Sequence, residues 1–446
     1  MLRFLTAGES HGPLLTGILD GIPAGLPLSQ DVIDAQLVRR QRGFGSGPRM
    51  KLERDRVTIT GGVLAGRTTG GPIALCLPNL DHPRWLDREI QPMTVPRPGH
   101  ADLAGAVKYG HRELRLSLER ASARETAMRV ALGAVCRALL AELHVEVLGY
   151  VVRIGEVALP ADTQAPDRAA YRLRARAAED SPVRCYDPAA AAAMSAAIDA
   201  TIRARDTVGG VVEVVALGVP PGLGSFAQAD RRLSARLAAA LMSVPATRGV
   251  ELGAGFASAA WPGTAAQDAY YPTGSEGRSP ADSLGDGPGD GPDDGPGDRF
   301  DPDAIVTRTN HAGGIEGGIS TSAPIVARVA CKPIATTLVP QPSVDLATGR
   351  AASARYERSD FCQVPRAVPI FEAVLCFVLA EALCEKLGGD SLDEMRPRLS
   401  SLRRLRWPDL SVDNQPWRPW PAPDAQAAAG ATDAAPDAAR KDADAP

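Results

Sequence analysis

The chain has 446 residues, of which 44% are hydrophobic and 4% aromatic, so it can bury a sizeable core built mainly from aliphatic side chains. Its seven cysteines lie far apart without CxxC or mixed Cys/His spacing, which argues against a disulfide framework and a zinc site. No run of about eighteen uncharged apolar residues occurs, and the opening MLRFLTAGESHG meets a charge and turn residues too early for a signal peptide. We therefore expect a soluble, cytoplasmic protein without a membrane partner.

The net charge of −4 conceals two acidic segments. Residues 276–303 hold nine acidic residues against two arginines, and residues 416–446 hold five against three bases, which leaves about +5 on the rest of the chain. A mildly basic body suits an anionic small molecule. The excess is too small, and too little clustered with aromatic side chains, for a nucleic-acid partner.

Strands and helices alternate in the first part of the chain. Apolar alternation bounded by turn residues predicts strands at residues 2–5, 14–19, 57–60, 73–77 and 145–152. Ser29 is a suitable N-cap for a helix that ends near Gly43, and apolar residues at helical spacing predict a longer helix over residues 119–143.

The second part repeats the same order of elements. The pattern predicts a helix at 189–205, a strand at 210–217, a helix at 230–243, a strand at 250–257 and a last apolar helix at 369–387, which two glycines end. The two halves are alike in architecture, although no residue repeat connects them. We expect one α+β domain over residues 1–390, with two pseudo-symmetric halves, and a C-terminal extension at 391–446.

Two segments have low-complexity composition. Residues 273–303 are almost wholly Gly, Pro, Asp and Ser, with GDGP in tandem, and this composition predicts a disordered acidic surface insert. Its Asp spacing resembles a calcium loop, but no bidentate Glu follows at the right place, so we predict a linker and no metal site. The extension is predicted to be largely disordered after residue 416.

Two histidines lie in glycine-flanked turns. In TAGESHG, His11 lies where backbone can approach a ligand closely and where an imidazole can exchange a proton near neutral pH. In RPGHAD, His100 has Asp102 two residues later, in a position to orient the ring. The alternatives are a His11 that only hydrogen-bonds its own turn and a His100 in a plain surface turn.

The segment LERASARETAMR opens the longer predicted helix. It carries Arg120 and Arg124 one turn apart, with Ser122 between them at the positive end of the helix dipole, which is typical of a phosphate site. The alternative is that both arginines are solvated and pair with Glu119 and Glu125 at helical spacing.

Three further motifs are weak singly. NHAGGIEGGIS has four glycines in six positions, which suits backbone binding of phosphate or of a flat ring system. It is not a GxGxxG fingerprint followed by a βαβ unit, and such loops are often only tight turns. KPIAT, which starts at Lys332, follows a predicted strand and carries a cation and a hydroxyl. ERSD places Arg358 two residues before Asp360.

Taken in this order, TAGESHG, RPGHAD, SARETAMR, NHAGGIEGG, KPI and ERSD resemble the signature set of the chorismate synthases, over residues 1 to about 390 except the acidic insert. The resemblance implies a β-α-β sandwich, a homotetramer, and a site where reduced FMN lies beside the substrate 5-enolpyruvylshikimate 3-phosphate. The implied reaction is an anti-1,4-elimination of phosphate and a proton that gives chorismate without net redox change, the last step of the shikimate pathway. NADPH bound at Arg40 and a separate flavin reductase are both open as the source of reductant.

The resemblance also assigns roles to single residues. His11 would protonate the departing phosphate, His100 would protonate the flavin side, and Asp360 would relay the abstracted proton. Arg40 matches a residue assigned to a nicotinamide cofactor or to an anionic substrate. The implied substrate contacts are Ser10, Arg49 and Arg124, and the implied FMN contacts are Arg120, Ala121, Ser122, Pro245, Ala246, Gly317, Lys332, Pro333, Ile334, Ala335, Thr336 and Arg358.

Three positions depart from the family pattern. Many relatives have Ser where Ala121 stands, Asn where Pro245 stands and Arg where Ser46 stands. The first two remain compatible with backbone or apolar contacts, whereas the third removes a charge-assisted contact that Arg42 or Arg49 would have to replace. Two rival functions are an FMN-dependent oxidoreductase acting on a phosphorylated metabolite and a non-catalytic anion-binding paralogue. Retention of the three implied catalytic residues argues against the paralogue.

Overall fold

The computed structural model describes residues 2–45, 54–160, 165–273, 301–354, 356–357, 359–413, 415–417 and 419–420. The chain divides into a large unit, Met1–Trp407, and a small one, Pro408–Pro446. The elements discussed below belong to the large unit. The predicted insert, apart from its ends, and most of the predicted disordered tail lie outside the described residues.

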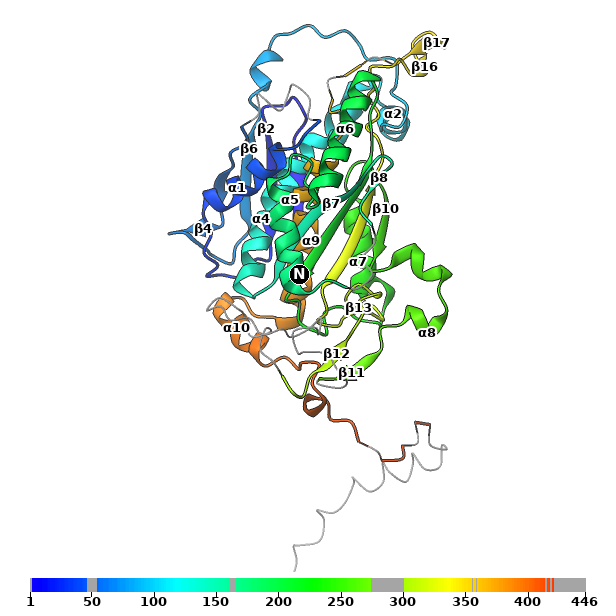
Figure 1. Cartoon of the computed structure of the whole chain (residues 1–446). Coiled ribbons are helices and arrows are strands. Elements are labelled where there is room, and N and C mark those ends of the chain that lie inside the picture. Colours follow the sequence, from blue (N-terminus) through cyan, green and yellow to red (C-terminus); the bar gives the residue numbers. More distant parts are fainter. Residues whose placement is uncertain are drawn as a thin grey trace, which may run out of the picture. The chain divides into compact units, whose positions relative to one another are not determined.

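Two antiparallel sheets form the framework of the large unit (Figure 1). The first sheet consists, in spatial order, of β1 (Arg3–Ala7), β2 (Leu14–Asp20), β6 (Ile73–Pro78) and β3 (Thr58–Gly61). The second consists of β10 (Thr247–Leu252), β15 (Ile325–Cys331), β9 (Gly210–Leu217), β7 (Glu146–Ile154) and β8 (Val157–Ala158). Most of these strands lie within a few residues of the predicted ranges, because alternation of apolar and polar residues marks a sheet with one buried face.

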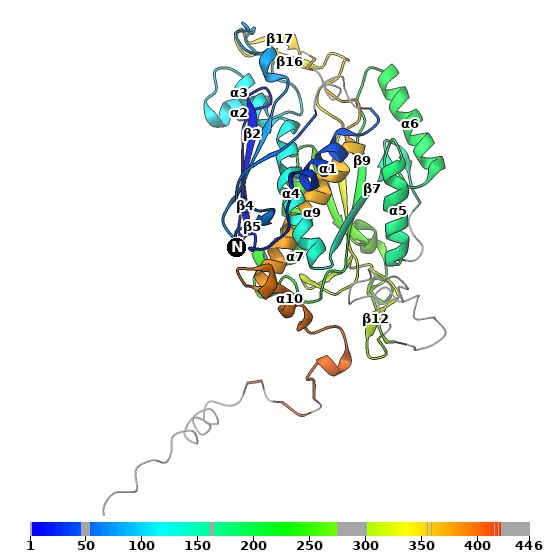
Figure 2. The ribbon, with the colours of Figure 1, turned by 90° about the vertical axis from the view of Figure 1, so that its left-hand side faces the viewer.

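A layer of helices lies between the two sheets, as Figure 2 shows for α4 and α9. Their apolar stripes face both sheets, and their buried side chains form one continuous core with those of the strands. The confirmed architecture is therefore a β-α-β sandwich. The helices of this layer are α1 (Gln30–Gln41), α4 (Thr126–Glu142), α7 (Leu233–Met242) and α9 (Val364–Leu387).

The two halves share one topology. If the four long strands of each half are numbered in chain order, both sheets have the spatial order 1-2-4-3. A helix follows the second strand of each half, α1 or α7, and another follows the fourth, α4 or α9. The pseudo-symmetric halves expected from the order of elements are thus present in the fold.

The remaining helices and hairpins lie outside the two sheets and the helical layer between them. α5 (Arg168–Asp180) packs against β7 on the face of the second sheet that is turned away from the central helices, over a separate apolar cluster. The others are α2 (Asp102–Tyr109), α3 (Arg115–Ala121), α6 (Pro188–Arg203), α8 (Gly263–Ala266), α10 (Leu392–Ser400) and the hairpins β4 (Val63–Leu64) with β5 (Arg67–Thr68), β11 (Tyr270–Pro272) with β12 (Ile305–Thr307), β13 (Ile315–Glu316) with β14 (Ile319–Ser320) and β16 (Pro342–Asp345) with β17 (Arg350–Ser353).

The single helix predicted over residues 119–143 is wrong, because the chain breaks at Ser122. α3 ends at Ala121, Ser122 is extended with ψ 144°, and a 3₁₀ turn at Ala123–Glu125 leads into α4. The Ser122 hydroxyl accepts the backbone N–H of Arg124, a side-chain cap that competes with a continuous helix. The break turns the backbone of this motif toward a cavity described below.

The last helix begins at Val364, five residues before the prediction, and runs through Pro369. A proline inside a helix cannot donate to the carbonyl four residues earlier, which here belongs to Pro365. Arg184 supplies the missing donor, since its Nη1 lies 2.6 Å from that oxygen. α9 is long and apolar enough to cross a membrane, but 83% of its most apolar window is buried, as in a core helix.

The large unit extends past residue 390, where we expected the domain to end. α10 belongs to it because Leu392 and Met395 are buried in the core. The Leu392 N–H donates to the Ala24 carbonyl at 2.9 Å, which ties α10 to the first half. The observed limit of this unit is Trp407.

Candidate active site

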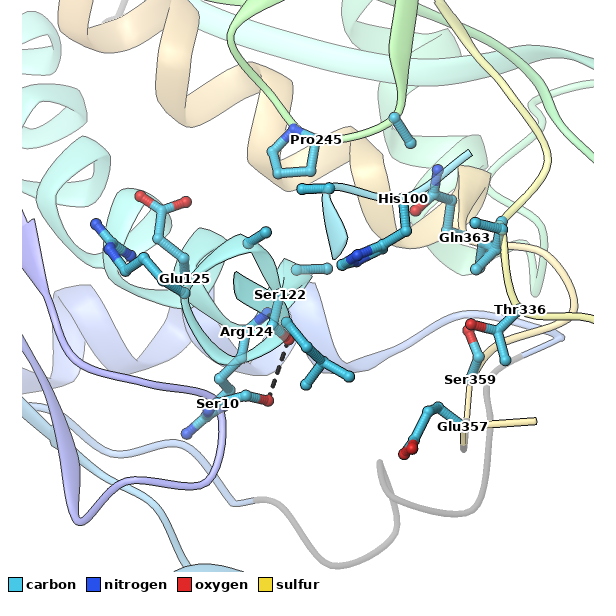
Figure 3. A pocket seen from close by; sticks show the side chains of 18 of the residues that line it. Ser10, His100, Ser122, Arg124, Glu125, Pro245, Thr336, Glu357, Ser359 and Gln363 are labelled. Carbon is cyan, nitrogen blue, oxygen red and sulfur yellow. Dashed lines mark hydrogen bonds between the residues drawn. The ribbon is translucent and has the colours of Figure 1, made fainter. Parts of the chain in front are cut away.

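A cavity of about 1030 Å³ gathers loops that are distant in sequence (Figure 3). Its wall includes the turn between β1 and β2, the loop before α2, the junction of α3 and α4, the turn between α7 and β10, the segment after β15, Glu357 and several residues from Ser359 to Arg366. In Figure 3, Pro245 and His100 lie across the space from Ser10 and Arg124, and Thr336 and Ser359 close another side. Both halves of the fold therefore contribute to one site.

Most of the residues singled out from the sequence line this cavity. Gly317 and Pro333 are not among the lining residues, and Gly317 lies in the turn of the β13–β14 hairpin, beside the start of α7. Arg49, Ser46 and Arg358 lie outside the described residues. The predicted residues that do line it are Ser10, His11, Arg40, His100, Arg120, Ala121, Ser122, Arg124, Pro245, Ala246, Lys332, Ile334, Ala335, Thr336 and Asp360.

His11 is held from several sides. Its Nδ1 lies 2.7 Å from Glu119 Oε1, and its backbone N–H donates to Glu119 Oε2 at 2.8 Å. The Trp85 ring packs on the imidazole, with centroids 4.0 Å apart at an angle of 37°. The histidine thus does more than bond its own turn, and the turn itself is docked on α3.

His100 is oriented by Asp102, as the spacing predicted. Nδ1 lies 2.6 Å from Asp102 Oδ1 and 2.9 Å from Arg97 Nη2. A guanidinium only donates and a carboxylate only accepts, so the shorter contact assigns the Nδ1 proton to the bond with Asp102. Burial raises the pKa of Asp102, but hydrogen bonds from Arg97 and His100 outweigh it and hold that pKa well below its usual range.

The lining is strongly cationic. Ten of its residues are arginine or lysine and four are aspartate or glutamate. Among the described residues, no carboxylate pairs with Arg88, Arg120, Arg248 or Lys332. Cations that face a cavity without a counter-ion favour an anionic ligand there. The ten are Arg40, Arg84, Arg88, Arg97, Arg120, Arg124, Arg129, Arg248, Lys332 and Arg366.

Lys332 marks one end of this cationic wall. Burial, and then the charge of Arg248, lower its pKa, and its ammonium group donates to the Gly99 carbonyl. Two like charges side by side cost free energy that a bound anion would recover. The Lys332 N–H also donates to the Ala246 carbonyl at 3.0 Å, so the segment after β15 is fixed to the turn before β10.

Arg40 and Arg124 share one buried carboxylate. Asp55 accepts two bonds from Arg124 Nη1 at 2.7 and 2.8 Å and lies 3.7 Å from Arg40 Nη1. Arg124 also donates to Asn79, while Arg40 donates to Thr126 and to the Ala123 carbonyl. Arg124 is therefore buried and not solvated, and Glu125 pairs at helical spacing with Arg129. Two guanidiniums around one carboxylate leave a net positive charge in the cavity wall.

Asp360 and Ser10 complete the polar lining. Asp360 pairs with Arg366, in the first turn of α9, and both lie in the wall. The Ser122 hydroxyl donates to Ser10 Oγ at 3.1 Å, the bond drawn in Figure 3. The turn that carries His11 is thereby bonded to the helix break.

Comparison with known proteins decides the family. The sequence profile described as chorismate synthase matches residues 2–384. The chain is 48% identical over 404 residues to the chorismate synthase of Trichlorobacter lovleyi, covering 89% of this chain and 97% of that one, and 47% identical over 410 residues to that of Thermobifida fusca, covering 88% and 96%.

The chain belongs to the chorismate synthase family. A solved structure titled "Crystal Structure of Chorismate Synthase" superposes with a TM-score of 0.69 at 39% identity, covering 90% of this chain and 96% of that one. The two departures from the family pattern that lie among the described residues, Ala121 and Pro245, both line the cavity.

Sequence reasoning does not assign several residues of this site, among them four that hold or flank its functional side chains. Glu119 was weighed only as a partner for nearby arginines, and Asp55, Trp85 and Arg248 were not considered. Their partners are distant in sequence, so local spacing carried no signal for them. Only the excess of basic residues outside the acidic segments pointed to a wider cationic wall.

Proposed function

We propose that this cavity converts 5-enolpyruvylshikimate 3-phosphate to chorismate by eliminating phosphate and a proton, with reduced FMN bound beside the substrate. The chain is a carbon–oxygen lyase of the chorismate synthase family. The observation that carries the proposal is one cavity that combines cations without a carboxylate partner in the described part of the chain and two histidines held through Nδ1 by carboxylates. The cations suit a phosphorylated dicarboxylate, and the histidines suit proton transfer.

The residues present fit a flavin mononucleotide. Leu118, Pro245, Ala246 and Ile334 give the cavity apolar surface for a flat ring. Lys332 and its neighbour Arg248, which pair with no carboxylate among the described residues, suit a phosphate. We propose that residues 245–246 and 332–336 hold the cofactor together with Arg120 to Ser122. When bound there, reduced FMN would provide electron density for the departure of the phosphate without net redox change.

The chain's own residues bind the substrate and move protons. Arg40 and Arg124, with Ser10, give the substrate anions a positively charged wall. His11 donates a proton to the departing phosphate oxygen. His100, held by Asp102, donates a proton on the flavin side, and Asp360, placed by Arg366, relays the proton removed from carbon.

Assembly and reductant supply are part of the proposal. Leu5, Leu14 and Ile18 are exposed on the outward face of the first sheet, which supports self-association as a homotetramer. Gly317, if it contacts FMN, would do so in the cavity of another subunit, since it does not line its own. NADPH near Arg40 and a separate flavin reductase remain two candidate sources of reductant. A cytoplasmic location rests on the biosynthetic role of the family.

Anaerobic turnover tests the function. Enzyme, pre-reduced FMN and 5-enolpyruvylshikimate 3-phosphate are mixed, and chorismate and phosphate are quantified with the flavin spectrum. We expect equal amounts of both products while the flavin stays reduced. Stoichiometric consumption of reductant would favour the oxidoreductase instead, and binding without products would favour the non-catalytic paralogue.

A further inference from the structure

Glu119, near the end of α3, holds the ring and the backbone of His11 with one carboxylate. Oε1 contacts His11 Nδ1 at 2.7 Å and Oε2 accepts the His11 N–H at 2.8 Å. The backbone carbonyl of Glu119 accepts the Ser10 N–H at 3.1 Å. Both side chains of the pair are 14% exposed, so water competes little for these bonds. A carboxylate bonded in this way fixes both the place and the orientation of the imidazole.

The charge on Glu119 decides which ring nitrogen carries hydrogen. Burial raises the pKa of Glu119, but the hydrogen bonds and charge of His11, followed by the charge of Arg115, bring it below its usual value. The carboxylate is therefore ionised at neutral pH and only accepts hydrogen bonds. Nδ1 must carry the hydrogen in the 2.7 Å contact, so the ring exchanges protons with a molecule in the cavity through Nε2.

The other groups around His11 restrict the same ring. Trp85 packs on it, and the guanidiniums of Arg88 and Arg115 lie 5.4 and 5.7 Å from the Trp85 ring centroid. His82 Nδ1 lies 2.9 Å from the His11 carbonyl oxygen, and because that oxygen only accepts, His82 donates. The backbone of His11 is thus bonded at its N–H and its C=O.

We propose that Glu119 is a positioning residue for the elimination: it keeps the hydrogen on Nδ1 of His11, so that the proton given to the departing phosphate is the one that Nε2 carries in the imidazolium form. The role in the reaction rests on the proposed function of His11. The assignment of the tautomer is independent of that function, because it follows from the contacts between His11 and Glu119. His100, which also lines the cavity, shows the same arrangement with Asp102.

Glu119→Gln is the informative substitution because a glutamine side chain has nearly the same shape but one acceptor oxygen. If that oxygen keeps the His11 N–H, the amide NH₂ faces Nδ1 and requires an unprotonated nitrogen there. The hydrogen of the neutral ring then moves to Nε2, and the imidazolium, which is the stronger acid, loses its acceptor at Nδ1. Glu119→Asp keeps an ionised acceptor. Glu213→Gln is the matched control, since Glu213 accepts the Tyr150 hydroxyl at 2.6 Å and does not line the cavity.

The first measurement is ¹⁵N NMR of histidine-labelled, flavin-free protein at neutral pH, with the His11 resonances assigned by His11→Ala. We expect a protonated Nδ1 in wild type, Glu119→Asp and Glu213→Gln, and an unprotonated Nδ1 in Glu119→Gln. An unprotonated Nδ1 in the wild type would overturn the inference without any variant. So would a Glu119→Gln spectrum identical to that of the wild type.

The second measurement is anaerobic kinetics with pre-reduced FMN. For Glu119→Gln we expect kcat to fall about 10- to 100-fold with KM changed less than about threefold, partial recovery in Glu119→Asp and wild-type values in Glu213→Gln. A loss confined to KM, or an unchanged kcat, would contradict the positioning role. If the wild type makes no chorismate, the proposed function fails, while the NMR result still decides the tautomer.

Discussion

Replacing Asp102 with asparagine should destabilise the protein strongly, because Asp102 is fully buried and bonded through both oxygens. Oδ1 accepts from Arg97 Nη2 at 2.9 Å and from His100 Nδ1 at 2.6 Å. Oδ2 accepts from Arg97 Nε at 2.8 Å and from the Arg97 N–H at 3.0 Å. An asparagine can satisfy one of these two sides, and its NH₂ group faces donors on the other.

The expected loss is about 3 to 5 kcal/mol of unfolding free energy at pH 7, the usual cost of removing one partner of a buried ion pair. Urea unfolding of wild type and Asp102→Asn measures it. Asp20→Asn is the matched control: Asp20 pairs with Arg3 at 3.0 Å on the surface, with 34% and 78% of the two side chains exposed. An exposed pair contributes about 0 to 1 kcal/mol.

Acidification should reduce the difference in unfolding free energy between the wild type and Asp102→Asn. The pKa of Asp102 is lower in the folded protein than in the unfolded chain, so the stabilisation is complete above the unfolded value and declines as pH falls below it. Below about pH 4 the difference should shrink by about 1.4 kcal/mol for each pH unit. A loss under about 1 kcal/mol at pH 7, or a difference that grows on acidification, would refute this account of Asp102.

Three further results follow from the structure. Gly133→Ala should cost about 1 to 3 kcal/mol in urea unfolding despite the better helix propensity of alanine, because the added Cβ would lie 2.5 Å from the Ala373 Cβ at the α4–α9 crossing; a neutral result would contradict the tight crossing. Lys332→Ala and Arg248→Ala should each weaken FMN binding by at least about tenfold in calorimetric titrations, and unchanged affinities would place the phosphate elsewhere. Deletion of residues 275–298 should leave FMN affinity and turnover within about twofold, because this stretch has few apolar residues, and a large loss in the folded deletion variant would show a role for it.

The strands and the order of the halves could be predicted from the sequence because their signal is local. Apolar alternation places β2, β6 and β9 within one residue of the observed bounds. The break at Ser122 and the early start of α9 could not be predicted in the same way. The first involves Ser10, which is 112 residues away, and the second needs Arg184, which is 181 residues from Pro365.

The residues of the site show the same distinction between contacts that are local in sequence and contacts that are distant. Asp102 lies two residues from His100, so its orienting role was visible in the motif and is confirmed by the 2.6 Å contact. Glu119 lies 108 residues from His11, and helical spacing suggested arginine partners for it instead. Most of the residues that the family resemblance implied do line the cavity, but they are fewer than half of its lining, and only the folded chain shows which charges are already paired.

The central claim, that this cavity carries out the elimination with His11 as proton donor to the phosphate, is tested most directly by phosphate release from His11→Ala. The variant is first shown by titration to be folded and saturated with reduced FMN and substrate. Rapid mixing under anaerobic conditions then follows phosphate. We predict release about 10²- to 10⁴-fold slower than in the wild type, with binding nearly unchanged. Phosphate release at the wild-type rate would contradict the claim.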